Sequence, residues 1–327
     1  MKYLFYPGCS MEKSAIPYLM SLKAIEDKLS MELVELEDWN CCGATEYSAV
    51  NRIASHALVG RNLAIAESMS AESHTLVAPC SACYLNLSKT DHYLQEDRIF
   101  KARIDDALAA GDMSYTPGSI EVRHALDVIY NEIGLEKIKA NVVKPLKGLR
   151  VAAYYGCMIV RPDLHGYYDS HEYPMILEEL LEALGAEVID FPMKTHCCSG
   201  HMTQISGETA YELIRRLIYG ATRYEADLMV TLCPMCQLNI DAYQSEANRY
   251  FKTDYVMPIL YFTQLIGLAF GIDAKDLGIG QEFVDPRPAL AKIDVEVDEA
   301  PAATKKRRVK EEGLPMPQMP GKNGGGD

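Results

Sequence analysis

The ten cysteines of this chain form one pattern that occurs twice. Each copy has a single cysteine, an adjacent pair and a C-x-x-C, and the first copy consists of Cys9, Cys41, Cys42, Cys80 and Cys83. The second copy consists of Cys157, Cys197, Cys198, Cys233 and Cys236, which leaves no cysteine over. A tetrahedral metal ion or a cubane cluster needs only four thiolates. Each half therefore has one thiol more than an ordinary site uses.

Residues around the cysteines repeat as well. Tyr6-Pro7-Gly8-Cys9 corresponds to Tyr154-Tyr155-Gly156-Cys157. Leu85-Asn86, shortly after the first C-x-x-C, corresponds to Leu238-Asn239 after the second. Self-similarity at such a long period indicates two copies of one structural unit, each with the same kind of site.

Length, composition and charge exclude several classes of protein. The chain has 327 residues, 48% hydrophobic and 24% charged, so it can form two domains with cores of their own and needs no disulfides for stability. It has no apolar stretch long enough to span a membrane and no signal-peptide pattern. We therefore expect a cytoplasmic protein whose thiols serve metals or redox chemistry. The net charge of −14 argues against nucleic-acid binding.

Apolar periodicity predicts short strands that alternate with helices in each half. Strands are expected at residues 2–6, 32–36, 74–78, 150–155, 187–191 and 228–232. Helices are expected at residues 14–29, 49–69, 174–184 and 208–224, with a further one after Cys83. This order predicts an α/β fold of two pseudo-symmetric repeats of short parallel strands flanked by helices. Every cysteine group follows a strand, which is where sites assemble in open α/β sheets.

The same pattern predicts two domains and a tail. The first domain spans residues 1–147 and the second spans residues 148–280, with a linker at residues 143–148. Residues 91–120 form a partly helical insertion in the first domain. Residues 281–327 are rich in Pro, Gly, Lys and Glu, so we expect them to form a disordered C-terminal tail.

Four kinds of thiol chemistry are compatible with the ten cysteines. Structural disulfides are disfavoured by the adjacent cysteines and by a reducing compartment. Two structural zinc sites would each leave one thiol spare, and zinc fingers take their ligands from short hairpins rather than from three strand ends. A thioredoxin-like dithiol would explain only the C-x-x-C. Iron–sulfur clusters are favoured, because thiolates are soft ligands and because Gly8, Gly43, Gly156 and Gly200 let the backbone approach a bulky cluster.

Each half resembles the CCG cysteine-rich domain, whose pattern is a single cysteine, a Cys-Cys pair and a C-x-x-C. A chain with two such domains, here over about residues 1 to 280, resembles the B subunit of heterodisulfide reductase. The resemblance implies two non-cubane [4Fe-4S] clusters with five cysteine ligands each. Cluster 1 would be held by Cys9, Cys41, Cys42, Cys80 and Cys83, and cluster 2 by Cys157, Cys197, Cys198, Cys233 and Cys236. The chain departs from the pattern at Ser199, which separates the second pair from Gly200.

The same resemblance implies a catalytic role. In that family a small disulfide, that of coenzyme M and coenzyme B in methanogens, binds between the two clusters and is reduced to two thiols. Electrons arrive from a flavin-containing A subunit through a ferredoxin-like C subunit. Cleavage of a disulfide takes two electrons, and two facing sites would hold both sulfurs as the bond breaks. We therefore expect a disulfide reductase that acts on the coenzyme M–coenzyme B heterodisulfide or a related disulfide.

Four other residues are candidates for assisting this reaction. Lys194, His196 and His201 flank the second pair and are candidates to donate protons or to bind an anionic substrate, although loop residues with no such role are the simpler interpretation. Arg161 is a candidate to pair with a sulfonate or phosphate of the substrate, and a structural ion pair explains it equally well.

Other functions fit the pattern too. The clusters could relay electrons, without catalysis, in another CCG-domain oxidoreductase complex, such as those that oxidise lactate, glycolate, glycerol phosphate or succinate. Alternatively, the thiols bind zinc and the chain is a zinc-stabilised scaffold for assembly. Zinc in the absence of acid-labile sulfide would identify the scaffold.

Overall fold

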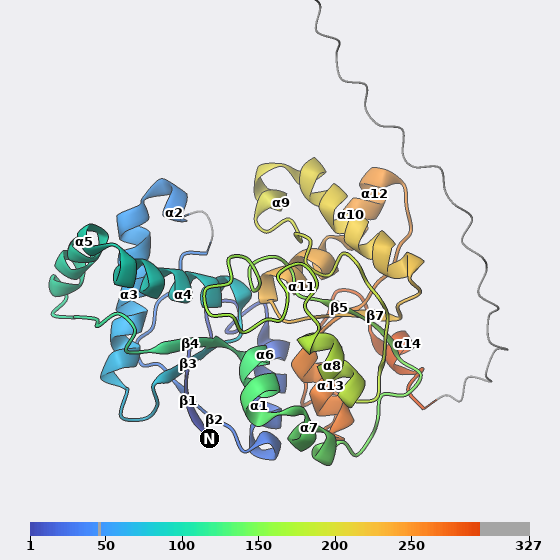
Figure 1. Cartoon of the computed structure of the whole chain (residues 1–327). Helices are drawn as coiled ribbons and strands as arrows, with labels where there is room; N and C mark the ends of the chain where they lie inside the picture. Colours follow the sequence, from blue (N-terminus) through green and yellow to red (C-terminus); the bar gives the residue numbers. More distant parts are fainter. Residues whose placement is uncertain (45–46, 295–327) are drawn as a thin grey trace, which may run out of the picture. The chain divides into compact units, whose positions relative to one another are not determined.

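Each repeat forms a four-stranded parallel sheet in the computed structural model, which describes residues 1–44 and 47–294 (Figure 1). The first sheet has the order β2-β1-β3-β4 and consists of β1 (Lys2–Phe5), β2 (Glu32–Glu35), β3 (Thr75–Ala78) and β4 (Glu121–His124). The second has the order β6-β5-β7-β8 and consists of β5 (Arg150–Tyr154), β6 (Glu187–Val188), β7 (Leu228–Thr231) and β8 (Ile259–Tyr261). The expected α/β class with two pseudo-symmetric repeats is confirmed.

The helices follow the same repeat. Those of the first repeat are α1 (Ile16–Leu29), α2 (Tyr47–Val50), α3 (Arg52–Ser68), α4 (Ser81–Glu96), α5 (Arg98–Ala109), α6 (Ala125–Asp127), the π-helical segment η1 (Val128–Ile133) and α7 (Leu135–Asn141). Those of the second are α8 (Ile176–Ala183), α9 (Met202–Ile205), α10 (Gly207–Arg223), α11 (Pro234–Ala242), α12 (Gln244–Phe251), α13 (Phe262–Ala269) and α14 (Arg287–Leu290). The helices α3 and α10 correspond and have 17 residues each.

Two helices differ from the expectation for local reasons. The helix expected at residues 49–69 is divided into α2 and α3 at Asn51, whose backbone is extended. The Asn51 side chain accepts a hydrogen bond from the N–H of Ala54, which makes Asn51 the N-cap of α3. The helix expected after Cys83 begins at Ser81, so that Cys83 lies within its first turn.

The two repeats share one core. Helix α1 of the first repeat packs against α13 of the second, and the rings of Tyr18 and Tyr261 stack with their centres 4.3 Å apart. The hydroxyl groups of Ser21 and Thr263 lie 2.6 Å apart across the same contact. Residues 1–294 therefore belong to one compact unit, in which the expected halves 1–147 and 148–280 are repeats in contact rather than separate bodies.

The chain remains folded beyond residue 280, where we expected a disordered tail. Residues 281–294 include α14, and the backbone N–H groups of Phe283 and Val284 donate to the carboxylate of Asp241 at 2.8 and 2.9 Å. The expected start of the tail at 281 is therefore wrong, because a buried carboxylate on α11 fixes this segment. Residues 295–327, the rest of the expected tail, lie outside the described residues.

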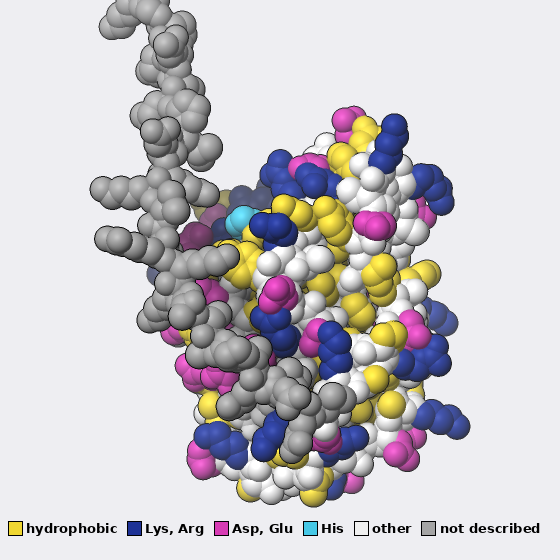
Figure 2. Space-filling view, turned by 90° about the vertical axis from the view of Figure 1, so that its right-hand side faces the viewer, with side chains coloured by type: hydrophobic (Ala, Val, Ile, Leu, Met, Phe, Trp, Pro, Cys, Tyr) yellow, Lys and Arg dark blue, Asp and Glu magenta, His cyan; other side chains and the backbone are white. Residues whose placement is uncertain are grey.

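Two observations concern the surface. In the described part of the chain, no helix combines the length and the apolar character that crossing a membrane requires. Figure 2 shows one face, on which lysine and arginine side chains are interspersed with acidic and hydrophobic ones. This face carries no large basic patch of the kind that attracts nucleic acids.

Candidate metal centres

The five thiols of the first repeat converge beyond the carboxyl ends of β1, β2 and β3. The sulfurs of Cys9 and Cys41 lie 3.6 Å apart, and those of Cys42 and Cys83 lie 3.4 Å apart. Cys80 contacts Cys83 through its thiol and joins the group. The topology thus brings together three loops that are far apart in the sequence, as parallel strands predict.

The second repeat assembles its thiols in the same way. Cys157 contacts Cys197, and Cys198 and Cys233 both contact Cys236. A small cavity of about 30 Å³ is lined by all five of these cysteines. Ser81 of the first repeat also lines this cavity, so the second site includes a residue from the other half.

The two sites meet at Cys80 and Cys233, whose buried thiols contact each other. The Tyr18 hydroxyl lies 3.2 Å from the carbonyl oxygens of both Pro79 and Leu232, the residues that precede these cysteines. One side chain therefore holds the corresponding turns of both repeats side by side. This contact places the two thiol groups next to each other.

A tyrosine supports the Cys-Cys pair in each repeat. The Tyr6 hydroxyl donates to the carbonyl of Asn40, directly before the first pair, at 2.7 Å. The Tyr154 hydroxyl donates to the carbonyl of His196, directly before the second pair, also at 2.7 Å. Both hydroxyls are buried next to thiols, so burial first and the nearby sulfurs second raise the pKa values of Tyr6 and Tyr154. Both therefore stay protonated and keep donating.

An asparagine holds the turn after each pair. Asn86 Nδ2 donates to the carbonyls of Cys42 at 3.2 Å and Ala44 at 2.6 Å. Asn239 Nδ2 donates to the carbonyl of Gly200 at 2.6 Å, at the position that corresponds to Ala44. These asparagines and tyrosines belong to the sequence repeat, but the repeat alone did not predict which backbone groups they contact.

The departure at Ser199 leaves the turn unchanged. Ser199 has a φ of 83° where Gly43, its counterpart, has 75°. The backbone N–H of Gly43 donates to the Cys41 sulfur, and that of Ser199 donates to the Cys197 sulfur. The serine therefore adopts the left-handed conformation that glycine favours and keeps the N–H···S contact.

Alanine at Gly8 or Gly156 is expected to disrupt the adjoining site. Their φ values are +74° and +70°, and a Cβ would lie 2.9 Å from the sulfur of Cys83 or Cys236, respectively. We expect each variant to lose about half of the bound metal, because only one site is damaged. Metal analysis of the purified variants tests this.

Gly134→Ala is the matched control for the two glycine variants. Gly134 also has a positive φ, +85°, but nothing lies within 4 Å of the position that a Cβ would take. This variant should therefore keep all of its metal, although its backbone conformation also favours glycine. Full metal content in Gly8→Ala and Gly156→Ala would contradict the close approach of backbone to sulfur.

The thiols of each site differ in acidity because they share protons. Hydrogen bonding with Cys42 and Cys9 lowers the pKa of Cys41 well below its ordinary value. A hydrogen bond from Cys157 lowers the pKa of Cys197 to about 6, against the opposing effect of burial. The pKa of the second cysteine of each C-x-x-C is raised, first by hydrogen bonds to neighbouring thiols and then by burial. Five adjacent thiolates repel one another, so the group ionises fully only with a cation among the sulfurs.

The residues present fit an iron–sulfur cluster in each repeat. Every donor is a thiol, the ligand that iron–sulfur clusters take, and backbone N–H groups point at several sulfurs. Hydrogen bonds of this kind stabilise negative charge on sulfur. No group of three or more His, Cys, Asp or Glu residues within residues 1–44 and 47–294 has the geometry of a site for one metal ion.

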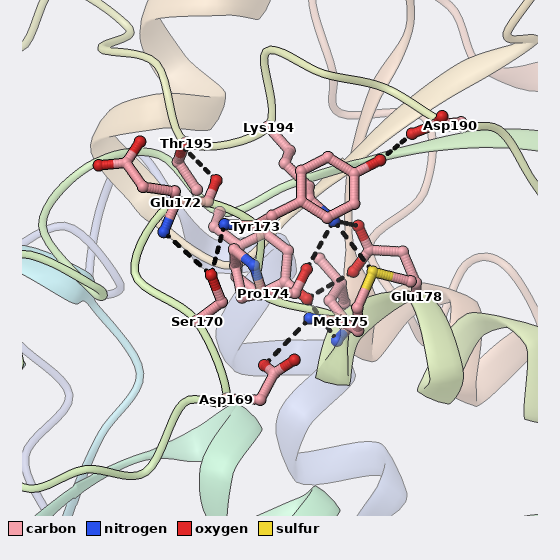
Figure 3. A network of polar contacts seen from close by, with 12 residues as sticks. Asp169, Ser170, Glu172, Tyr173, Pro174, Met175, Glu178, Asp190, Lys194 and Thr195 are labelled. Atoms are coloured by element: carbon pink, nitrogen blue, oxygen red, sulfur yellow. Dashed lines mark hydrogen bonds and ion pairs between the residues drawn. The ribbon is translucent and has the colours of Figure 1, made fainter.

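Lys194 has a position that the sequence did not indicate. Figure 3 shows its buried ammonium group among residues that lie before and at the start of α8. Lys194 Nζ donates to the carbonyl of Pro174 at 2.6 Å and to Glu178 at 2.7 Å, and it lies 3.5 Å from the centre of the Tyr173 ring. Met175 Sδ lies 3.3 Å from the same nitrogen. These partners occupy its donors, so Lys194 stabilises the loop before α8, beside the second site.

The other three candidate residues lie close to the second pair. Arg161 Nη2 donates to the carbonyl of Thr195 at 2.8 Å, and its other terminal nitrogen lies 3.8 Å from Glu172. His196 is exposed directly before Cys197, and His201 is partly exposed at the start of α9. The structure therefore brings Arg161 to the loop that carries His196, whereas the Lys194 ammonium is directed into the interior.

Known proteins share this arrangement of cysteines. The family of CCG cysteine-rich domains matches the chain twice, at residues 3–88 and 151–241. The two matches contain all ten cysteines and cover more than half of the chain. The chain belongs to the CCG family. Each match contains all five cysteines of one thiol site and, apart from the first residue of β1 or β5, three of the four strands of one sheet; β4 and β8 lie outside the matches.

Two relatives match this CCG protein over nearly their full length. One, from Methanosarcina acetivorans, is named as the B subunit of a ferredoxin/F(420)H(2)-dependent CoB-CoM heterodisulfide reductase and is 32% identical over 89% of this chain and 97% of that protein. Another, from Wolinella succinogenes, is named 8-methylmenaquinol:fumarate reductase membrane anchor subunit and is 37% identical over 87% of this chain and 97% of that protein. The resemblance to the B subunit of heterodisulfide reductase is thus confirmed.

A solved structure shares the fold. A hypothetical protein from Helicobacter pylori superimposes with a TM-score of 0.68 over 87% of this chain, with 13% sequence identity. The CCG chain spans 52% of that protein's length. At this identity the likeness supports the fold alone.

Proposed function

We propose that this chain is the catalytic iron–sulfur subunit of a heterodisulfide reductase-type complex. The observation that carries the proposal is the pair of five-thiol sites, alike in their supports and in contact at Cys80 and Cys233. Cys9, Cys41, Cys42, Cys80 and Cys83 would hold one non-cubane [4Fe-4S] cluster, and Cys157, Cys197, Cys198, Cys233 and Cys236 the other. Each cluster, when bound, supplies one-electron redox chemistry.

The proposed reaction is the reduction of a small disulfide to two thiols. One S–S bond breaks, and the two sulfurs take up two electrons and two protons. A nearly symmetric S–S bond suits two corresponding sites, because each half can receive one sulfur. His196 and His201 beside the second pair are the proposed proton donors, and Arg161 is the proposed partner of an anionic group on the substrate.

The remaining parts of the proposal concern the surroundings of the subunit. We place the complex in the cytoplasm, with a ferredoxin-like subunit and a flavin-containing subunit as electron-donating partners. The names of the relatives support an assembly of this kind, because each is called a subunit of a larger reductase.

A second candidate function is a quinol-linked electron relay. Its support is the relative from Wolinella succinogenes, named for a fumarate reductase and 37% identical to this chain. In that case the same ten thiolates would hold the clusters, and electrons would pass between a quinol and a partner subunit without any disulfide. The zinc-stabilised scaffold stays a third candidate until the metal is identified.

An activity measurement separates the first two candidates. The chain, purified without oxygen, is mixed with reduced methyl viologen and then with the coenzyme M–coenzyme B heterodisulfide or with cystine. The disulfide reductase predicts viologen oxidation on addition of one of these disulfides, with two thiols formed per disulfide and two viologens oxidised. No turnover with either, together with metal centres that 8-methylmenaquinol reduces, would contradict it and favour the relay.

A further inference from the structure

We propose that the first repeat has a second binding site, separate from its thiols, which takes a small oxyanion between α3 and α4. A cavity of about 180 Å³ lies between these helices. Its lining includes Arg52 and His56 from α3, and Asn86, Lys89 and Thr90 from α4. This site goes beyond the function proposed above, since no sulfur chemistry is needed for it.

The two cations of the cavity are held by aromatic rings. The Arg52 guanidinium lies 4.5 Å from the centre of the Phe100 ring and 5.4 Å from that of Tyr93, and the Lys89 ammonium lies 5.9 Å from that of Tyr93. Among residues 1–44 and 47–294, neither cation forms an ion pair. A ring face attracts a cation without accepting conventional hydrogen bonds, so these N–H groups stay available to a ligand.

The charge of the cavity is opposite to that of the whole chain. The lining contains no aspartate or glutamate among the described residues, although the chain has 46 acidic residues against 32 basic ones. Burial first, and then the charges of Arg52 and Lys89, lower the pKa of His56 to about 4. Two unpaired cations near a neutral ring favour entry of an anion.

Neutral donors complete the site. The His56 ring is buried, and its Nδ1 lies 2.8 Å from the hydroxyl of Thr90. Ser55 and Asn86 contribute a further hydroxyl and amide to the lining. A guanidinium, an ammonium and several hydroxyl or amide groups together suit a ligand with several charged oxygens.

The second repeat provides an internal comparison. Helices α3 and α10 correspond along their whole length, and α11 corresponds to the first nine residues of α4, Ser81 to Lys89. The residues that correspond to Arg52, His56, Lys89 and Thr90 are Gly207, Tyr211, Ala242 and Tyr243. Both cations are thus absent from the second repeat, and the Tyr211 and Tyr243 rings lie 6.5 Å apart at this place. The cationic cavity is therefore a feature of the first repeat and not a consequence of the fold.

The cavity adjoins the turn that follows the first Cys-Cys pair. Asn86, which lines it, is the residue that holds the carbonyls of Cys42 and Ala44. Ser55 also lines it, and the Ser55 hydroxyl oxygen lies 3.8 Å from the position of a Cβ on Gly43. An anion bound here would contact the supports of the first Cys-Cys-Gly turn and leave the second turn untouched.

Calorimetric titration of the full chain, purified without oxygen, tests the site. Inorganic phosphate, sulfate and succinate are titrated in separate runs at constant ionic strength in chloride buffer. We expect one equivalent of at least one of these anions to bind. Arg52→Gln and Lys89→Gln should each weaken that binding about 10-fold, and the double variant should abolish it. Binding of phosphate or sulfate alone would assign a tetrahedral oxyanion, and binding of succinate alone a carboxylate.

Arg98→Gln is the matched control, because Arg98 is an exposed cation on the neighbouring helix α5 and lies outside the cavity. It should bind the anion as the unchanged chain does. Thermal unfolding and metal content of each variant show whether it is folded. Two results would overturn the proposal: no saturable binding of any of the three anions, or unchanged binding in the double variant. Either result is independent of disulfide reduction, so the two proposals fail separately.

Discussion

Replacing Cys42 with alanine is expected to lower the iron content of the anaerobically purified chain from about eight to about four atoms. Cys42 is buried, and its sulfur lies 3.4 Å from that of Cys83, so its loss removes a central ligand of the first site. The second site keeps all five of its own thiols. Cys198→Ala should give the same result from the other half.

Ser88→Ala is the control for the cysteine variants. Ser88 is buried on α4, the helix that carries Cys83, but belongs to neither thiol site. It should keep about eight irons, because the packing change is similar and no ligand is lost. If Cys42→Ala retains the iron of the unchanged chain, this cysteine is not a ligand. If it loses all iron, the two sites do not bind metal independently.

Replacing Glu178 with alanine is expected to destabilise the fold by about 3–5 kcal/mol. Lys194 and Glu178 are 1% and 5% exposed, and their charged atoms lie 2.7 Å apart. The Tyr155 hydroxyl donates to the second carboxylate oxygen of Glu178 at 2.5 Å. The variant would leave a buried ammonium group without its counter-ion, which is the costly way to break a buried pair. Urea unfolding of both chains measures the difference.

Two further variants make this result specific. Lys194→Met combined with Glu178→Leu removes both charges, so it should recover most of the lost stability. Glu136→Ala breaks the exposed ion pair with Lys139 and should cost less than about 1 kcal/mol. Equal, small effects of Glu178→Ala and Glu136→Ala would show that the buried pair contributes little.

The sequence predicted the strands that precede the cysteines, because each is apolar and ends at a turn. It did not predict β4 and β8, the strands at the edges of the two sheets. The sequence of β4 is Glu-Val-Arg-His, with one apolar residue, and the three residues of β8 run directly into the apolar helix α13. Neither segment is a separate apolar run bounded by turn residues, which is the signal on which a strand prediction depends.

The sequence predicted the cysteines of the candidate site but not the contacts of the side chains around them. The ten cysteines stood out because their repeat is a one-dimensional signal. The direction of a loop side chain is not such a signal, so proximity to Cys197 suggested a site role for Lys194 whereas its ammonium faces Glu178. The sequence did not predict the cavity with Arg52 and Lys89 either, because only the packing of α3 on α4 brings the two cations together.

The content of iron, acid-labile sulfide and zinc in the chain purified without oxygen, followed by electron paramagnetic resonance with and without a thiol, decides whether the two thiol sites hold redox clusters. We predict about eight irons and about eight sulfides per chain, and a signal that changes when the thiol is added. Zinc without sulfide would contradict this, because the CCG fold would then hold a structural metal in place of redox clusters.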